Sequence, residues 1–216
     1  MIIIGAKGFA KEVLEVLLQL NYTQNIAFYD DVNQIGDALY DKFPILKNEN
    51  EVKAFFEVNG NDFTIGIGNP QLRYKLYKKF ISLGGNIVST VSPFANFSSY
   101  EINIGIGTNI LMNSVFSSSV TIGKCCIVYY NSIITHDCEI DDFVEISPGV
   151  TLLGRCRIGS FSRIGANATI LPDVKIGKNV TIGAGAVVNK DIPDNSLAYG
   201  IPAVIIKSFE PFNENE

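Results

Sequence analysis

The feature that most constrains this chain is a six-residue repeat of apolar side chains over residues 104–188. An apolar residue occupies every sixth position of this segment, fifteen times in succession. Because 47% of the chain is hydrophobic, chance gives this result with a probability of roughly one in 10⁵ for a given phase. The repeat therefore predicts a solenoid. Its members are Ile104, Ile110, Phe116, Ile122, Val128, Ile134, Ile140, Ile146, Leu152, Ile158, Ile164, Ile170, Ile176, Ile182 and Val188.

The positions two residues before each repeat residue are also restricted, because they carry only small or aliphatic side chains. A hexad with one large and one small inward residue describes a short β segment followed by a corner. Three hexads then close a triangular coil of 18 residues. We expect about five coils, in a prism about 24 Å tall, in which residues 18 apart are vertical neighbours.

Glycines follow the same 18-residue period. Four of them fall on one corner, with Asp141 in the remaining slot, and two fall on a second corner. Glycine, asparagine and aspartate suit corners that require a positive φ, which is the role expected of these residues. An antiparallel barrel or sandwich would need hairpin signals such as Asn-Gly, and the repeat region has none. The glycines are Gly105, Gly123, Gly159 and Gly177 on the first corner, and Gly165 and Gly183 on the second.

The whole chain has 216 residues, which suits two domains because the repeat begins only near residue 95. We expect an α/β domain over residues 1–94, the prism over residues 95–190 and a tail over residues 191–216. A net charge of -5 without a basic cluster argues against nucleic acid or an anionic membrane as the main partner. No stretch resembles a signal peptide or an apolar span, which predicts a cytoplasmic protein.

Cysteine and histidine usage limits the chemistry further. All four cysteines lie in the repeat, and we expect reduced core thiols rather than disulfides in a chain without export signals. A single histidine argues against a multi-histidine metal site, so we predict no metal.

The N-terminal segment has the pattern of a nucleotide-binding α/β domain. A short apolar run over residues 1–4 is followed by Gly5, Ala6, Lys7, Gly8 and Phe9, and then by a helical apolar pattern. Strand, glycine turn and helix present backbone N–H groups to a phosphate. A second strand, over residues 26–29, ends in an acidic pair that can hold a ribose or a base edge.

Later segments fit the same class. We expect helices over residues 49–57 and 71–83 and a strand over residues 63–67 that ends in Gly68. The acidic pair is Asp30 and Asp31. Because the full GxGxxG pattern is absent, a dinucleotide-dependent dehydrogenase is a poor fit.

Together the two parts resemble the sialic acid O-acetyltransferase-like sugar acyltransferases, and most closely their nucleotide-sugar N-acetyltransferases of the bacillosamine type. The resemblance rests on residues 2–11, 28–31, 135–140 and 200–203 and covers nearly the whole chain. It implies a small Rossmann-like α/β domain followed by an all-β left-handed parallel β-helix of hexapeptide repeats. It further implies that the first domain binds the nucleotide of a UDP-type sugar, and that acetyl-CoA lies between neighbouring subunits of a homotrimer.

Acetyl transfer from a thioester needs a base for the attacking group and a donor for the developing oxyanion. Histidine is the side chain that exchanges protons near neutral pH, and His136, the only one, is placed just past a corner and outward. The resemblance gives Asp137 the role of orienting His136 by a hydrogen bond. Gly154, 18 residues after His136, is one coil above it, where its N–H could meet the thioester carbonyl; a plain corner glycine is the alternative.

The resemblance also assigns binding residues and shows two departures. It implies that Gly5, Ala6, Lys7, Gly8, Phe9, Asp30, Asp31 and Gly68 border the sugar nucleotide, and that Glu145, Ala166 and Ala184 contact acetyl-CoA. The family usually has histidine at the positions of Phe9 and Glu145. The change at Phe9 puts the identity of the acceptor in question, and a carboxylate at Glu145 could hold an ammonium group. Glu145 lies half a coil from His136, so the two could meet only across a trimer interface.

These observations lead to one expected activity and its rivals. We expect an acetyl-CoA-dependent N-acetyltransferase that acts on the amino group of a nucleotide-linked amino-deoxysugar for surface glycan synthesis. A sugar O-acetyltransferase would use the same base, and a non-catalytic β-helix scaffold would not need the histidine beside an aspartate. A metal-dependent hydratase requires three histidines and is excluded. No activated cysteine or serine flanks His136, which predicts direct attack without an acyl-enzyme.

Overall fold

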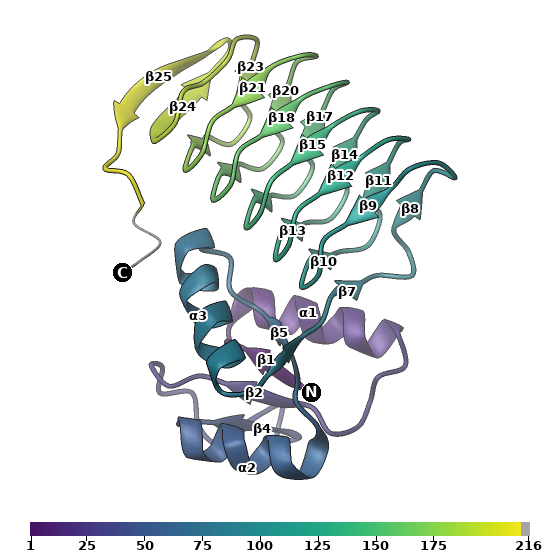
Figure 1. Cartoon of the computed structure of the whole chain (residues 1–216), viewed down its shortest axis with the longest axis vertical. Helices are drawn as coiled ribbons and strands as arrows, with labels where there is room; N and C mark the ends of the chain where they lie inside the picture. Colours follow the sequence, from purple (N-terminus) through teal and green to yellow (C-terminus); the bar gives the residue numbers. More distant parts are fainter. Residues whose placement is uncertain (213–216) are drawn as a thin grey trace.

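The computed structural model describes residues 1–212 and shows two parts, an α/β domain and a triangular prism stacked beside it (Figure 1). The α/β domain is built on a six-stranded sheet in the order β3-β4-β2-β1-β5-β6, parallel except where β3 pairs with β4. Its strands are β1 (Ile2–Ile4), β2 (Ala27–Tyr29), β3 (Ala38–Leu39), β4 (Phe43–Leu46), β5 (Asp62–Ile65) and β6 (Asn86–Ile87). Its helices are α1 (Gly8–Gln19), α2 (Glu49–Asn59) and α3 (Pro70–Ser82).

Local sequence signals account for several elements of the α/β domain. The three isoleucines of β1 are all buried, as expected of a central parallel strand covered on both sides. Asn48 caps α2 by accepting a hydrogen bond from the backbone N–H of Glu51 at 3.1 Å. Asn69 caps α3 in the same way, and Pro70 occupies its first turn. Local sequence signals thus set the starts of these two helices.

The prism has three parallel sheets, called here face 1, face 2 and face 3. Face 1 contains β7 (Thr90–Val91), β10 (Asn109–Ile110), β13 (Ile127–Val128), β16 (Glu145–Ile146), β19 (Arg163–Ile164) and β22 (Thr181–Ile182), extended by β24 (Ser196–Gly200) and the antiparallel β25 (Ala203–Ser208). Face 2 contains β8 (Asn96–Phe97), β11 (Val115–Phe116), β14 (Ile133–Ile134), β17 (Thr151–Leu152), β20 (Thr169–Ile170) and β23 (Val187–Val188). Face 3 contains β9 (Asn103–Ile104), β12 (Thr121–Ile122), β15 (Glu139–Ile140), β18 (Arg157–Ile158) and β21 (Lys175–Ile176).

Strand register confirms the 18-residue coil. Val128 pairs with Ile110 on one side and with Ile146 on the other. From Ile110 to Val188 every repeat residue is at most 2% exposed, and Ile104 is partly buried at the start of the column. The predicted fold class, an α/β domain followed by a parallel β-helix of hexapeptide repeats, is therefore confirmed.

The corner glycines have a different role from the one expected. None of the six has a positive φ. The positive φ falls two residues after the first glycine column, for example at Phe143 and Phe161. A Cβ atom on Gly159 would lie 2.6 Å from the carbonyl carbon of Gly177, so these glycines allow successive coils to approach closely. The expectation was wrong because close packing, rather than backbone conformation, excludes a side chain there.

A buried arginine joins the two parts. Arg73, on α3, is 1% exposed and donates all its hydrogen bonds to main-chain carbonyls. Burial lowers the pKa of its guanidinium. Tyr74 adds an edge-on contact to Phe143 at 5.3 Å between ring centroids. The acceptors of Arg73 are Ile67 at 3.2 Å and Gly68 at 2.5 Å in the α/β domain, and Cys125 at 2.7 Å, Phe143 at 2.7 Å and Val144 at 3.1 Å in the prism.

The chain end returns toward this junction. After β25 it runs back from the far end of the prism toward α3 (Figure 1), and Phe212 packs on Phe161 at 4.9 Å. Within residues 1–212, no helix has the length and apolar character required to cross a membrane.

Candidate active site

The corner between β14 and β15 holds the predicted base. His136 and Asp137 project from it, each with a side chain 52% exposed. Nδ1 of His136 lies 2.7 Å from Oδ2 of Asp137. Asp137 has a φ of 59°, and this left-handed turn lets two adjacent side chains lie on the same side of the corner. The structure therefore forms the pair that an imidazole base and an orienting carboxylate require.

Gly154 lies directly above the imidazole, as the 18-residue register predicts. A Cβ atom at this position would lie 2.5 Å from Cε1 and 2.7 Å from Nε2 of His136. The backbone N–H of Arg155 donates to the carbonyl of His136 at 3.0 Å and holds the two corners together. Gly154 thus provides the space that the imidazole occupies.

A column of charges continues upward from Asp137. Arg155 and Asp173 follow at intervals of 18 residues, and Arg155 pairs with Asp173 through Nε at 2.6 Å and Nη2 at 2.9 Å. The hydrogen bond from Arg155 holds the pKa of Asp173 below its usual value. Arg155 therefore forms its ion pair with Asp173, one coil above, and Asp137 forms its hydrogen bond with His136. Sequence reasoning missed this column, although the spacing of the three residues signals it.

The cysteines lie inside the prism. All four are free and fully buried, Cys138 included, although it follows His136 by only two residues. Burial raises the pKa of Cys125 and of Cys126 to about 12. A fully buried thiol cannot reach and attack a thioester in solution. No group of three or more His, Cys, Asp or Glu side chains suited to a metal ion occurs in the part of the chain described.

The predicted nucleotide site is a small pocket at the carboxyl ends of β1 and β2. It has a volume of ≈ 180 Å³ and is lined by Ile4, Gly5 and Ile67 together with residues 29–33. Gly5 has a φ of 94°, and a Cβ atom there would lie 2.7 Å from Cδ1 of Ile67. Its backbone N–H donates to the carbonyl of Tyr29 at 2.7 Å. Glycine is thus required at position 5 because the backbone has a positive φ and because a side chain would clash with Ile67.

The glycine turn leads into α1 without a side-chain cap. Ala6 is buried, Lys7 is the N-cap residue, and Gly8 begins the helix. A helix start without a capping side chain leaves backbone N–H groups free to donate hydrogen bonds to an anion. Nζ of Lys7 instead donates to Oδ1 of Asn33 at 2.5 Å, which ties the glycine turn to the loop after β2.

The acidic pair after β2 is held by protein groups. Asp30 is buried, and its Oδ1 accepts from the backbone N–H groups of Val32 at 3.2 Å and Asn33 at 2.9 Å. Asp31 accepts from the hydroxyl of Tyr29 at 2.6 Å and from Nζ of Lys79 at 3.2 Å. Asp30 therefore shapes the loop, and both Asp30 and Asp31 line the pocket. Sequence reasoning missed Asn33, although Asx turns of this kind are typical of Asp followed by polar residues.

The two residues that depart from the family pattern lie at the junction of the domains. Phe9 packs against Tyr129 at 5.0 Å between ring centroids. Glu145 lies on face 1 against Gly68, and its side chain is 9% exposed. Sequence reasoning missed Tyr129, since a tyrosine in the repeat carries no local sign of its contact with α1.

The remaining predicted residues, Ala166 and Ala184, lie on another edge of the prism. They stand one coil apart at the corner between faces 1 and 2; Ala166 is partly exposed and Ala184 is exposed. A Cβ atom on Gly165 would lie 2.6 Å from the backbone nitrogen of Ala184. His136 lies at the corner between faces 2 and 3, so a single chain does not bring these residues together.

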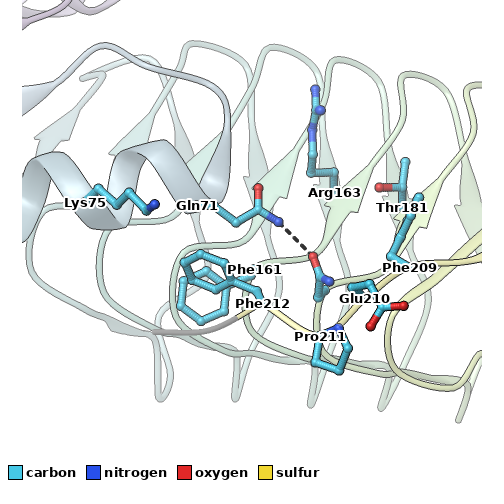
Figure 2. A pocket seen from close by; sticks show the side chains of 10 residues that line it. Gln71, Lys75, Phe161, Arg163, Thr181, Phe209, Glu210, Pro211 and Phe212 are labelled. Carbon is cyan, nitrogen blue, oxygen red and sulfur yellow. Dashed lines mark hydrogen bonds between the residues drawn. The ribbon is translucent and has the colours of Figure 1, made fainter. Parts of the chain in front are cut away.

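A larger hollow, of ≈ 390 Å³, lies between α3, face 1 and the returning chain end (Figure 2). Gln71 and Lys75 of α3 border it, and Nε2 of Gln71 donates to Oδ1 of Asn179 at 2.8 Å. Arg163, which also lines it, pairs with Glu145. None of the predicted site residues borders this hollow.

Comparison with known proteins agrees with both parts of the architecture. Residues 1–80 match the family model described as PglD N-terminal domain, and residues 155–190 match the bacterial transferase hexapeptide (six repeats). The acetyltransferase domain of PglB from Neisseria gonorrhoeae FA1090, in complex with acetyl coenzyme A, is 32% identical over 95% of this chain and 98% of its own, with a TM-score of 0.86.

Two further solved structures cover nearly the whole chain. A histidine-to-alanine mutant of GDP-perosamine N-acetyl transferase from Caulobacter crescentus, in complex with CoA and GDP-perosamine, is 27% identical over 96% of each chain, with a TM-score of 0.88. WeeI from Acinetobacter baumannii AYE is 28% identical over 95% of this chain and 98% of its own, with a TM-score of 0.84.

Proposed function

The chain belongs to the hexapeptide-repeat acyltransferases with a PglD-type N-terminal domain, and from this premise we propose that it N-acetylates a nucleotide-linked amino sugar. The donor is acetyl-CoA, which is bound in the PglB structure. The acceptor class follows the GDP-perosamine complex of the Caulobacter crescentus enzyme. The proposal places the enzyme in surface glycan synthesis, in the cytoplasm where its substrates are made.

The observation that carries the proposal is the pair formed by His136 and Asp137 on an outward corner. With Nδ1 of His136 bonded to Asp137 at 2.7 Å, Nε2 is left to take the proton of an attacking amine. The amine nitrogen forms the new amide bond with the acetyl carbon, and the carbon–sulfur bond breaks to release the thiol of coenzyme A. The proton moves from the amine to His136 and then to the leaving sulfur.

Two features of the corner support direct transfer. The buried cysteines offer no nucleophile for an acyl-enzyme. Gly154, above the imidazole, is the residue that we propose donates its backbone N–H to the developing oxyanion. A side chain at this position would exclude the imidazole before any thioester could reach it.

We further infer a homotrimer with sites between chains. Its support is face 2, whose outward positions carry no charge and include Val115 and Ile133, each 42% exposed. Face 2 separates the edge with His136 from the edge with Ala166 and Ala184. Packing of face 2 around a threefold axis would bring the first edge of one chain toward the second edge of the next. The acetyl-CoA site would then take residues from two chains.

In the nucleotide domain, the pocket behind the glycine turn is the proposed site of the sugar nucleotide. Gly5 and the uncapped start of α1 support phosphate binding, and residues 29–33 would border the nucleoside. The sugar would extend past Ile67 toward Gly68.

The test is thiol release from acetyl-CoA in the presence of UDP-, dTDP- and GDP-linked 4-amino sugars, followed by NMR of the product. We expect release with at least one acceptor and an amide N–H signal in the product. An ester product would assign the enzyme to O-acetylation. Binding of acetyl-CoA without release on any acceptor would refute the assignment to amino sugars.

A further inference from the structure

Glu145 is the outward residue of a prism strand that the α/β domain covers. Outward charged residues elsewhere on the prism strands, such as Glu139, Arg157 and Lys175, are exposed to solvent. Glu145 is only 7% exposed because α3 and the loop before it pack over face 1 at this level. A carboxylate in such a place is unfavourable unless it has partners.

Only one of the two carboxylate oxygens of Glu145 accepts a hydrogen bond from a residue in the range 1–212. Oε2 accepts from Nε of Arg163, one coil above, at 3.2 Å. Oε1 has no hydrogen-bond partner among residues 1–212. Every described side-chain oxygen that is sealed from solvent has a hydrogen-bond partner, so Oε1 is not one of the sealed atoms. Oε1 therefore reaches solvent through an opening while the rest of the side chain is buried. One acceptor oxygen is available at the end of a narrow space.

Gly68 of the α/β domain lies beside the carboxylate of Glu145. A Cβ atom built on Gly68 would lie 3.5 Å from Oε2 and 3.9 Å from Oε1, so the absence of a side chain at Gly68 leaves room beside the carboxylate. Ile67, the preceding residue, lines the nucleotide pocket. Consecutive Cα atoms lie about 3.8 Å apart. A sugar attached to a nucleotide in that pocket can therefore extend along Ile67 and Gly68 to Glu145.

The unpaired oxygen Oε1 needs a hydrogen-bond donor, such as an N–H group, as its partner. The charge of Arg73 interacts with that of Glu145, but the guanidinium donates its hydrogen bonds to main-chain carbonyls. Tyr129 also lies nearby, and burial, followed by the charge of Glu145, raises the pKa of its hydroxyl. One coil below Glu145 is Ile127, which is buried and apolar. Among residues 1–212, Arg163 is the one group that donates a hydrogen bond to the carboxylate.

We propose that Glu145 binds the amino group of the acceptor sugar and makes the enzyme prefer an amine over a hydroxyl. The inference rests on the proposed function and adds the residue that selects the acceptor. It moves Glu145 from the acetyl-CoA site, where family resemblance places it, to the acceptor site. Because His136 lies on another edge of the prism, the base that serves this acceptor comes from a neighbouring chain of the proposed trimer.

The test compares Glu145→Gln with Glu139→Gln. Glu139 is a matched control, because it pairs with Arg157 one coil above, at 3.1 Å, as Glu145 pairs with Arg163. The probes are the best amino-sugar nucleotide from the acceptor panel, its analogue with a hydroxyl in place of the amine, and acetyl-CoA. KM is measured for both substrates, and the analogue is measured as a competitive inhibitor.

We expect Glu145→Gln to raise KM for the amino sugar about tenfold or more, the effect of losing a hydrogen bond to a charged group. KM for acetyl-CoA and the inhibition constant of the hydroxyl analogue should change less than about twofold. The preference for amine over hydroxyl then falls by the same factor as the acceptor KM rises. Glu139→Gln should leave all three values unchanged.

Each other result has a definite meaning. A rise in KM for acetyl-CoA alone would assign Glu145 to the donor site and overturn the inference. Unchanged constants in Glu145→Gln, with a wild type that turns over amino sugars, would make the residue structural. If Glu145→Gln does not fold, Glu145→Asp serves, because it keeps the charge but shortens the reach, and it should raise the acceptor KM selectively. A wild type that is silent on the whole panel would instead reject the proposed function.

Discussion

Replacement of Arg73 by methionine should uncouple the α/β domain from the prism. The guanidinium is the sole hydrogen-bond donor, among residues 1–212, to the carbonyls of Ile67, Gly68, Cys125 and Phe143. Methionine is a shorter apolar side chain without a donor, so all four carbonyls lose their partner. The bonds to Cys125 and Phe143 are buried, and those to Ile67 and Gly68 are partly buried. Each buried loss is worth about 1–3 kcal/mol, so the two buried carbonyls alone give a destabilisation of at least about 2 kcal/mol. A typical domain has only about 5–15 kcal/mol of stability.

The conservative variant Arg73→Lys should give a smaller loss of stability than Arg73→Met. Lysine has three donors and cannot supply all four carbonyls, so Arg73→Lys should lose at least one of them, about 1–3 kcal/mol. Arg157 provides the control, since it is exposed and forms an ion pair with Glu139. An exposed pair of this kind contributes about 0–1 kcal/mol, and Arg157→Met should remain within that range.

The assay is urea unfolding followed by far-UV circular dichroism, together with KM for each substrate. Arg73 holds the carbonyls of Ile67 and Gly68, at the edge of the proposed acceptor path. KM for the acceptor should therefore rise more in Arg73→Lys than KM for acetyl-CoA. A loss below about 1 kcal/mol in Arg73→Met, with an unchanged acceptor KM, would refute the reasoning.

Three further predictions concern the corner and the interface. Gly154→Ala has a permitted backbone but places a methyl group on the ring of His136, so kcat should fall about 10²-fold while thermal stability changes little. Asp173→Asn frees Arg155 to pair with the carboxylate beside His136. Because Arg155 then competes with His136 for Asp137, kcat should fall about tenfold or more, and added Arg155→Gln should restore it. Ile133→Glu puts a charge on face 2, and light scattering should show monomers in place of trimers.

The sequence predicts the prism well because its period is written directly in the chain. Each repeat residue alternates with a corner at fixed spacing, so register, coil length and vertical neighbours follow without any knowledge of the rest. The position of Gly154 above His136 was predictable in this way. The same map failed for the corner glycines, because spacing shows where they lie but not whether φ or close packing requires them.

The junction between the domains was not predictable from local pattern. Arg73 lies in an amphipathic helix rich in lysine, where an arginine is normally a solvated surface residue. Its prism acceptors stand 52 to 71 residues away in the chain. Asp30 was expected to contact ligand, and its additional hydrogen bonds to the backbone of Val32 and Asn33 were not expected. Such contacts depend on the tertiary fold, and no periodicity records them.

The most direct test of the account is the kcat of His136→Ala at saturating acetyl-CoA and amino-sugar acceptor. Loss of a general base costs about 10²–10⁴-fold in rate, so the account predicts a fall of at least about 10²-fold with both KM values nearly unchanged. A kcat close to that of the wild type would contradict the assignment of His136 as the base.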